Sequence, residues 1–342
     1  MAGYQQPWQQ QQFNQQQAYY QGQQHGQQQH QYSTPLQKQQ QQLQAISGHH
    51  HQQINVSWLQ QLPGFQHPQT AAWLDSLQER IAAFVERVVP NAQEQQHRDA
   101  CLAAFTKIAE QTLPDHAQAM QVALFGSGAA GLSLHSSDLD VVLAGLAVPE
   151  PSKGGFDAVT KGFIVNCLRR LERACRWGAG RYTLGVQGGK VIGKARVPVL
   201  KLQLGSGTEL DVSLNDDGGI KAVRFLQSFQ QDYTAVRPLT LLLKCILKQR
   251  GLSDVSTGGL GSWSLVNMVL AHLMALSGTG EQVDHLGSML LSFLQRFGVE
   301  FDLHTEAVAV KRGGFVKRKS LAKNFARGGI LCLEDPLTGV AW

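Results

Sequence analysis

The chain of 342 residues has few cysteines and no long apolar run. Its five cysteines show neither paired nor metal-ligand spacing: Cys101, Cys167, Cys175, Cys245 and Cys332. Their odd number and scatter argue against a disulfide framework and favour a reducing compartment. No stretch reaches the roughly 20 apolar residues that cross a bilayer, and the opening MAGYQQPWQQ lacks the apolar core of a secretory signal. We therefore expect a soluble protein of the cytosol or nucleus.

Acidic residues are outnumbered by basic ones, 25 against 30, which gives a net charge of +5. This modest excess is compatible with a polyanionic partner. Residues 1–53 are rich in Gln and bury too little apolar surface to offset the entropy of ordering, so we expect a disordered tail. Its run His49-His50-His51 is a weak metal-binding candidate, and chance beside poly-Gln is the simpler explanation.

Apolar periodicity predicts the order of the elements after this tail. Helical spacing is seen at 71–89, 95–113, 156–177, 220–232, 238–251, 262–276 and 283–297. Strand patterns occur at 122–125, from Asp138 to 143, across 178–214, and as a hairpin at 305–311 and 315–319. Four arginines of the helix 156–177 lie at helical spacing: Arg169, Arg170, Arg173 and Arg176. A solvated face is the default interpretation of this stripe, and an RNA-facing patch is the minority alternative.

One segment, LFGSGAAGLSLHSSDLDVVL, carries the strongest chemical signal. Gly126 and Ser127 follow a strand, where glycine permits a tight turn and free N–H groups suit a phosphate. Asp138 and Asp140 open the next apolar run and, being two apart, point to the same face of a strand. A third carboxylate, Asp211, lies in the alternating run ELDVSL and joins the pair if the two strands are neighbours.

Three carboxylates this close repel one another, and divalent cations remove that conflict. Mg²⁺, or Mn²⁺ in its place, prefers oxygen ligands and takes one or two carboxylates plus substrate phosphates. Two such ions, roughly 3.5–4 Å apart, activate an attacking hydroxyl and stabilise a leaving pyrophosphate. The pattern therefore predicts transfer from a nucleoside triphosphate to a hydroxyl. The plainer alternative is that Ser127 caps a helix and Ser136 and Ser137 shape a turn.

Three blocks resemble the nucleotidyltransferases of the DNA polymerase β superfamily, and more closely the noncanonical poly(A) polymerases and terminal uridylyltransferases. They are FGSGAAGLSLHSSDLDVVL, VPVLKLQLGSGTELDVSLNDDGGIKAV and RPLTLLLKCILKQRGLSDVSTGGLGSWSLVNMVLAHL. The third block and the ending LEDPL are typical of the nuclear, TRAMP-type branch. The resemblance implies an α+β fold in which a catalytic palm lies beside a helical central domain. It implies N-terminal helices packed on the central domain at 54–118, a palm at 119–216 and the central domain at 217–342.

The same resemblance assigns roles to individual residues. Asp138, Asp140 and Asp211 match the catalytic, metal-binding carboxylates, and Gly126 and Ser127 the triphosphate turn. The remaining nucleotide-binding positions match Gly219, Lys244, Lys248, Ser262 and Trp263, the last in place of a tyrosine that stacks on the base. The plain alternatives stay open: solvated side chains for the two lysines and a core position for Trp263.

Two departures from the family pattern stand out. After LEDPL the family continues into a loop that helps select the nucleotide, whereas this chain ends at Trp342. We expect a truncated gene model, a splice variant or a protein that lost activity. A Gly-rich insertion around 178–193 has no functional interpretation from sequence.

The leading hypothesis is an RNA 3′-terminal nucleotidyltransferase that adds AMP from ATP, in nuclear RNA surveillance and decay. UTP is the alternative substrate and the cytoplasm the alternative location. A noncatalytic RNA- or protein-binding scaffold is the competing class. The resemblance also implies a zinc-knuckle RNA-binding protein and an RNA helicase as partners.

Overall fold

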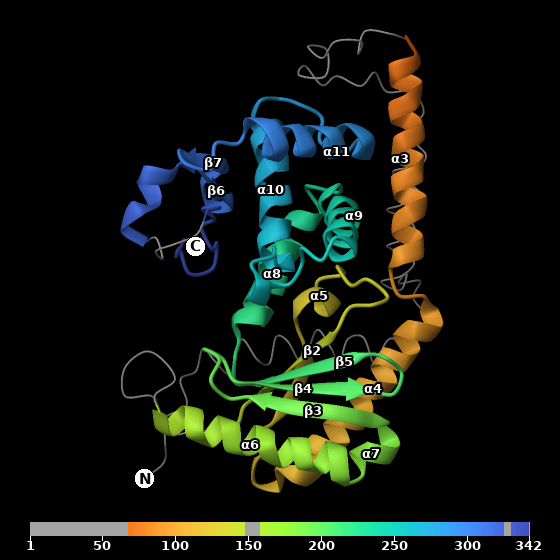
Figure 1. Cartoon of the computed structure of the whole chain (residues 1–342), viewed down its shortest axis with the longest axis vertical. Helices are drawn as coiled ribbons and strands as arrows, with labels where there is room; N and C mark the ends of the chain where they lie inside the picture. The colour runs from red at the N-terminus through yellow and green to blue at the C-terminus, as the bar shows by residue number, and fades with distance from the viewer. Residues whose placement is uncertain (1–67, 148–157, 325–329, 342) are drawn as a thin grey trace, which may run out of the picture. The chain divides into compact units, whose positions relative to one another are not determined.

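The computed structural model describes residues 68–147, 158–324 and 330–341, and these belong to one unit within His50–Trp342. The Gln-rich tail, the His49–His51 run and the loop expected at 149–155 lie outside the described residues. A five-stranded sheet in the order β1-β2-β5-β4-β3 organises the first half (Figure 1). Its strands are β1 (Gln121–Leu124), β2 (Leu139–Ala144), β3 (Val186–Ile192), β4 (Val199–Leu204) and β5 (Glu209–Leu214). Within this sheet β2 and β5 pair in parallel, and the other neighbouring strands pair antiparallel.

One face of this sheet forms the main core. Leu139, Val141 and Leu143 alternate along β2 and pack with Leu210 and Val212 of β5. Helices α4 (Ala92–Thr112) and α6 (Ala158–Trp177) cover this face, and the short α7 (Gly180–Thr183) follows α6. Because side chains alternate along a strand, the polar residues of β2 and β5 are left on the opposite face. The candidate site lies there.

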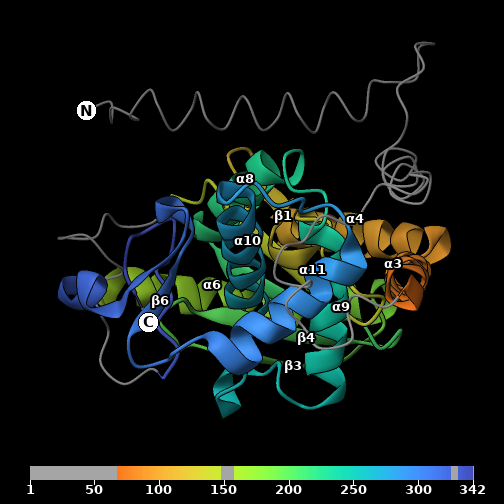
Figure 2. The ribbon, with the colours of Figure 1, turned by 90° about the horizontal axis from the view of Figure 1, so that it is seen from above.

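The helices of the second half are α8 (Gly218–Gln230), α9 (Val236–Gln249), α10 (Ser262–Gly278) and α11 (Leu286–Gln295). Helix α9 packs on α10, and α11 lies against α3 (Pro68–Val88) (Figures 1 and 2). A small hairpin, β6 (Glu306–Ala309) and β7 (Gly314–Lys317), packs on α10 and confirms the turn expected at Gly313-Gly314. No helix of the described ranges is long and apolar enough to cross a membrane.

The two N-terminal helices divide between the sheet and the helical half. We expected both to pack on the helical part, and α3 does contact α9 and α11. Helix α4 instead places Phe105 and Ile108 in the core of the sheet. The chain turns between them at Pro90, and Asn91 starts α4 with a reciprocal capping box to Glu94. For α4 the expectation was wrong, because its apolar stripe faces the sheet and not the helices.

Element boundaries are otherwise close to the expected ones. The short helix α5 (Gly126–Ala129) starts at Gly126, and Asp138, where the strand was expected to begin, directly precedes β2. The Gly-rich insertion forms α7 and the edge strand β3. Helix α7 was missed because a helix of four residues is too short to show a helical period.

Candidate active site

Two neighbouring strands bring Asp140 and Asp211 together. In the parallel pairing of β2 with β5, Asp140 and Asp211 are direct partners in the register. Directly opposed residues share a face of the sheet, so both carboxylates lie on the face opposite the main core. The condition set by the sequence, that the two strands be neighbours, is confirmed.

The charges of the three aspartates act on one another. Burial, followed by the charges of Asp211 and Asp138, raises the pKa of Asp140 to about 6. Burial also raises the pKa of Asp211, and the charge of Asp138 adds to that effect. Burial and the neighbouring negative charges together therefore disfavour ionisation of Asp140 and Asp211.

Sequence reasoning missed Lys201, which lies opposite Asp211 on β4. The Lys201 Nζ donates to Asp211 Oδ2 in an ion pair. Burial lowers the pKa of Lys201, and the hydrogen bond and charge of Asp211 more than offset it, so that the pKa is raised. The sequence offered one sign of this contact, a single lysine inside the apolar run VPVLKLQL. This lysine shares a strand face with Asp211 only if β4 and β5 pair.

The Gly126-Ser127 turn touches the carboxylate of Asp140. Gly126 has φ of +61°, and a Cβ atom there would lie 2.2 Å from Asp140 Oδ2. The Phe125 N–H donates to the Asp140 carbonyl over 2.9 Å, which fixes the turn against β2. Only glycine meets both the positive φ and the close approach. Ser127 follows within α5, next to this contact.

Lys244 and Lys248 of α9 both bind the segment that joins α5 to β2. Lys244 Nζ donates to the Leu132 carbonyl over 3.1 Å and to Ser137 Oγ over 3.3 Å. Lys248 Nζ donates to the Ser136 carbonyl over 2.7 Å. Burial lowers the pKa of Lys244 to about 8, opposed by the charges of Asp140 and Asp138. Lys244 therefore belongs to the carboxylate cluster, and neither lysine is merely solvated.

A buried arginine holds the same segment from the other side and was also missed. Arg98 of α4 is 5% exposed and donates to the carbonyls of Ser137 over 2.5 Å and His135 over 3.0 Å. A lone arginine in a helix gives no signal in sequence that it will bind backbone carbonyls almost forty residues away.

Gly219, Ser262 and Trp263 lie around α8 and α10. A Cβ at Gly219 would lie 2.2 Å from the ring of Phe125, so α8 approaches the residue before the Gly126 turn. Ser262 is the first residue of α10. The half-buried Trp263 ring lies edge-on to Phe225 of α8, 6.1 Å between centroids. Within the described residues, none of these three shows a hydrogen bond to the carboxylates.

The carboxylate oxygens of this cluster suit a hard divalent cation, although they are not gathered around one position. Within the described residues, no three acidic, histidine or cysteine side chains are gathered tightly enough to hold a metal ion as they stand. However, the Asp211 Oδ1 is buried and has no hydrogen-bond partner in this part of the chain. An unsatisfied carboxylate oxygen beside a second carboxyl of raised pKa is the environment that a cation would relieve. The carboxylates of Asp140 and Asp211 therefore fit such an ion once the Lys201 Nζ leaves Asp211 Oδ2.

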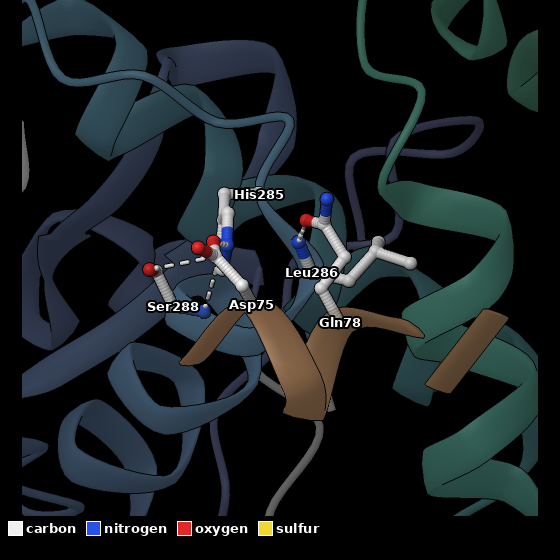
Figure 3. A network of polar contacts seen from close by, with 5 residues as sticks. All are labelled: Asp75, Gln78, His285, Leu286 and Ser288. Atoms are coloured by element: carbon white, nitrogen blue, oxygen red, sulfur yellow. Dashed lines mark hydrogen bonds and ion pairs between the residues drawn. The ribbon is translucent and has the colours of Figure 1, made fainter. Parts of the chain in front are cut away.

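Two other features resemble sites and are distinct from this one. A cavity of about 240 Å³ beside Lys248 is lined by Val88, Leu134, His135, Ser136, Cys245, Lys248 and Gln249, and includes no carboxylate. Asp75, His285 and Ser288 are the residue types of a hydrolase triad (Figure 3). The Ser288 N–H donates to His285 Nδ1 over 3.1 Å, and Ser288 is fully buried. This histidine is a helix cap that ties α11 to α3.

A parallel strand pair carrying two aspartates, preceded by a Gly-Ser turn, defines a nucleotidyltransferase-type palm. Comparison with known proteins agrees. Residues 77–231 match the family model for the central palm domain of mitochondrial-like poly(A) RNA polymerase, and residues 285–339 match that of the Cid1 family poly A polymerases. The two matches confirm the predicted resemblance to the noncanonical poly(A) polymerases for the palm and for the C-terminal part of the described chain.

Individual relatives are named as poly(A) RNA polymerases. Poly(A) RNA polymerase CID14 of Cryptococcus neoformans is 28% identical over 77% of this chain and 33% of its own length. Poly(A) RNA polymerase cid14 of Schizosaccharomyces pombe is 29% identical over 75% of this chain and 36% of its own length. This chain thus spans about a third of the length of these relatives.

Solved structures support the α+β fold. The polymerase core of TRAMP, an RNA surveillance complex, matches with a TM-score of 0.61 and 25% identity over 77% of this chain and 78% of that one. The Cid1 poly(U) polymerase matches with a TM-score of 0.59 and 19% identity over 76% of this chain and 85% of that one. At that identity the second likeness concerns the fold alone.

Proposed function

We propose that this protein adds nucleotides, AMP from ATP in the first place, to the 3′ hydroxyl of RNA without a template. The observation that carries the proposal is the register of Asp140 with Asp211, preceded by a glycine turn that touches Asp140. The names of the relatives, poly(A) RNA polymerases, support ATP as the donor.

In this proposal Asp138 and Asp140 would hold both of two Mg²⁺ or Mn²⁺ ions, and Asp211 the ion nearer the attacking hydroxyl. Bound there, the ions would supply Lewis-acid activation of the hydroxyl and neutralise the departing pyrophosphate. The chain's own groups orient the donor. The Gly126-Ser127 turn would offer its backbone N–H groups and the Ser127 hydroxyl to the phosphate oxygens of the donor.

Lys244 is the main protein cation facing the donor. Its charge already acts on Asp138 and Asp140 across the cluster, and its pKa of about 8 leaves it mostly protonated at neutral pH. An incoming triphosphate would compete for it with the Leu132 carbonyl. Lys248, which is more exposed, would add charge at the outer end of the same helix face.

Base contacts are assigned to Ser262 and Trp263, with Gly219 beside the turn. The aromatic face of Trp263 suits stacking, which is worth about 1–3 kcal/mol per base and accepts any base. Stacking alone does not select ATP over UTP, so the choice of donor is a separate question for experiment.

The cellular setting belongs to the same proposal. We assign the protein to nuclear RNA surveillance and decay, with a zinc-knuckle RNA-binding protein and an RNA helicase as partners. Similarity to the polymerase core of TRAMP supports this assignment. Co-purification of the tagged protein from nuclear and cytoplasmic extracts tests both location and partners, and recovery from cytoplasm alone would contradict the nuclear assignment.

The chemistry is tested by incubating the purified protein with an oligo(A) primer, Mg²⁺ and each nucleoside triphosphate in turn. Extension with ATP, and its loss in the double variant Asp138→Ala/Asp140→Ala, is the expected result. Preferential extension with UTP would reassign the donor. Extension that survives the double substitution would exclude the mechanism, and absence of both extension and ATP binding would favour the scaffold.

A further inference from the structure

Positive charge is concentrated in one short stretch of the chain. Between residues 169 and 196 there are eight basic residues and one acidic residue, a net charge of +7. The whole chain carries only +5, so the remaining residues are net negative. Such segregation differs from the mixed charge of an ordinary solvated surface.

The fold gathers this stretch onto one edge of the sheet. Helix α6 runs beside the edge strand β3: a Cβ at Gly189 would lie 3.4 Å from Arg176 Cδ, and one at Gly193 would lie 3.0 Å from Val165 (Figure 1). The exposed side chains of this surface, here called the basic edge, are Arg169, Arg173, Trp177, Tyr182, Lys190 and Lys194.

Within the described residues, the basic edge lacks the acidic partners that would make it a plain salt-bridged helix face. Arg169 and Arg173 are four apart on α6, and like charges at that spacing disfavour the helix. Glu172, the one acid in the stretch, is paired with Arg176 over 2.8 Å. The exposed cations are therefore available to an anionic partner.

Aromatic planes alternate with the cations. Trp177 is 68% exposed and Tyr182 is 86% exposed, although large aromatic side chains are usually covered. The Arg176 guanidinium lies 5.1 Å from the centre of the Trp177 ring. Cations for phosphates combined with free aromatic faces for bases are the two elements of single-strand recognition. An acidic protein partner would use the charges and leave the rings without a role.

The basic edge is joined to the carboxylates by a row of cross-strand partners. Lys190 on β3 pairs with Lys201 on β4, which pairs with Asp211 on β5, which pairs with Asp140 on β2. Partners in register share a face, so Lys190 lies on the carboxylate face, three strand spacings or about 14 Å from Asp140. Arg169 and Arg173 lie on the helix-covered side of the same edge.

We propose that the basic edge binds the single-stranded RNA upstream of the 3′ end, guiding it around β3 toward the carboxylates. The inference rests on the proposed function for the identity of the RNA end. It assigns a role to the Gly-rich insertion, since a side chain at Gly189 would crowd Arg176, whose Cδ lies 3.4 Å from the position of a Cβ there.

The test compares two double variants that remove the same charge. Arg169→Gln/Arg173→Gln removes charge from the basic edge, and Arg80→Gln/Arg87→Gln removes it from exposed positions of α3. Fluorescence anisotropy with a 20-residue oligo(A) is measured over a range of salt. Log affinity falls as log salt rises, and the first variant is expected to make this negative slope shallower by about 1.4. Each phosphate contact with single strands contributes about 0.7 to the slope. The second variant is expected to keep the wild-type slope.

A third variant, Trp177→Ala/Tyr182→Ala, separates stacking from charge. It should weaken oligo(A) binding about tenfold or more while leaving the salt slope unchanged. Both basic-edge variants should retain the wild-type rate of nucleotide addition at saturating primer and show a raised KM for the 20-residue primer.

Equal slopes and affinities for the three variants and the wild type would overturn the inference, as would failure of the wild type to bind oligo(A). Equally tight binding to polyglutamate or to anionic phosphatidylserine vesicles would assign the surface to another partner. Failure of the proposed function has a different signature: oligo(A) binding with the predicted slopes, but no nucleotide addition.

Discussion

At the scale of single residues, the candidate site is a set of charges that only partly neutralise one another. Asp140 and Asp211 face each other across a strand pair, Lys201 holds Asp211, and Lys244 faces Asp140 from α9. Burial makes each of these charges costly. The arrangement therefore lowers stability at the place where we propose that a cation and a triphosphate bind.

The first prediction concerns this cost. In EDTA at pH 8, Asp140→Asn should raise the free energy of unfolding by up to about 3 kcal/mol, because the native pKa of about 6 lies above the ordinary 3.8. The destabilisation of the wild type by the Asp140 charge is complete above the native pKa. It disappears below about pH 4, where the carboxyl is protonated in both the folded and the unfolded state. Urea titrations at pH 8 and pH 4 measure the difference.

The exposed Asp115→Asn provides the control, with little change expected at either pH. An Asp140→Asn variant that is less stable than the wild type at pH 8 would contradict the charge cluster.

The second prediction concerns Lys201. Lys201→Met should tighten binding of Mn²⁺ to the nucleotide-free protein by about tenfold, because it frees Asp211 Oδ2 and removes a nearby positive charge. Lys190→Met removes the same charge one strand further out and should change the affinity much less. Electron paramagnetic resonance of free Mn²⁺ gives both dissociation constants. Equal affinities in the two variants would mean that the ion pair does not compete with the metal.

At the scale of elements, the segment from Leu132 to Asp138 is held from two sides. Arg98 binds its carbonyls from α4, and Lys244 and Lys248 bind it from α9. A helix that packs on the sheet and a helix of the second half therefore meet at the residues leading into β2. Displacement of either helix would move Asp138.

The third prediction tests the turn that starts α5. Gly126→Ala should destabilise the protein by about 1–3 kcal/mol and abolish nucleotide addition, since the new Cβ would enter the Asp140 carboxylate at a strained φ. Gly128→Ala, two residues on, meets only Ser133 Oγ at 3.9 Å and is the matched control. Equal urea midpoints for the two variants would show that the turn is not locked against Asp140.

At the scale of the whole molecule, α3 connects the start of the described chain to α11. Asp75 Oδ1 accepts from His285 Nε2 over 3.2 Å, and Gln78 Oε1 accepts from the Leu286 N–H over 2.9 Å. Both contacts cross more than two hundred residues of sequence. They fasten the region matched by the Cid1 family model, which begins at residue 285, to the first helix of the described chain.

The fourth prediction measures that connection. His285→Ala should lower the free energy of unfolding by about 1–2 kcal/mol, because the α11 cap to Ser288 is lost together with the contact to Asp75. Asp75→Ala should cost less, since its side chain is 45% exposed. The exposed His304→Ala serves as control. Additive losses in the Asp75→Ala/His285→Ala double variant would show that the two side chains are not coupled.

The sequence by itself determined the site's local geometry: the Gly-Ser turn after a strand and the two-residue spacing of Asp138 and Asp140 depend only on neighbours along the chain. It also predicted most helices, because a 3.6-residue apolar period is a local pattern. Tertiary structure decided that β2 and β5 pair, that Lys201 faces Asp211, that α4 covers the sheet and that Arg98 reaches the segment before β2. These depend on strand order and helix packing between distant residues, and no local pattern encodes which distant residue becomes a neighbour.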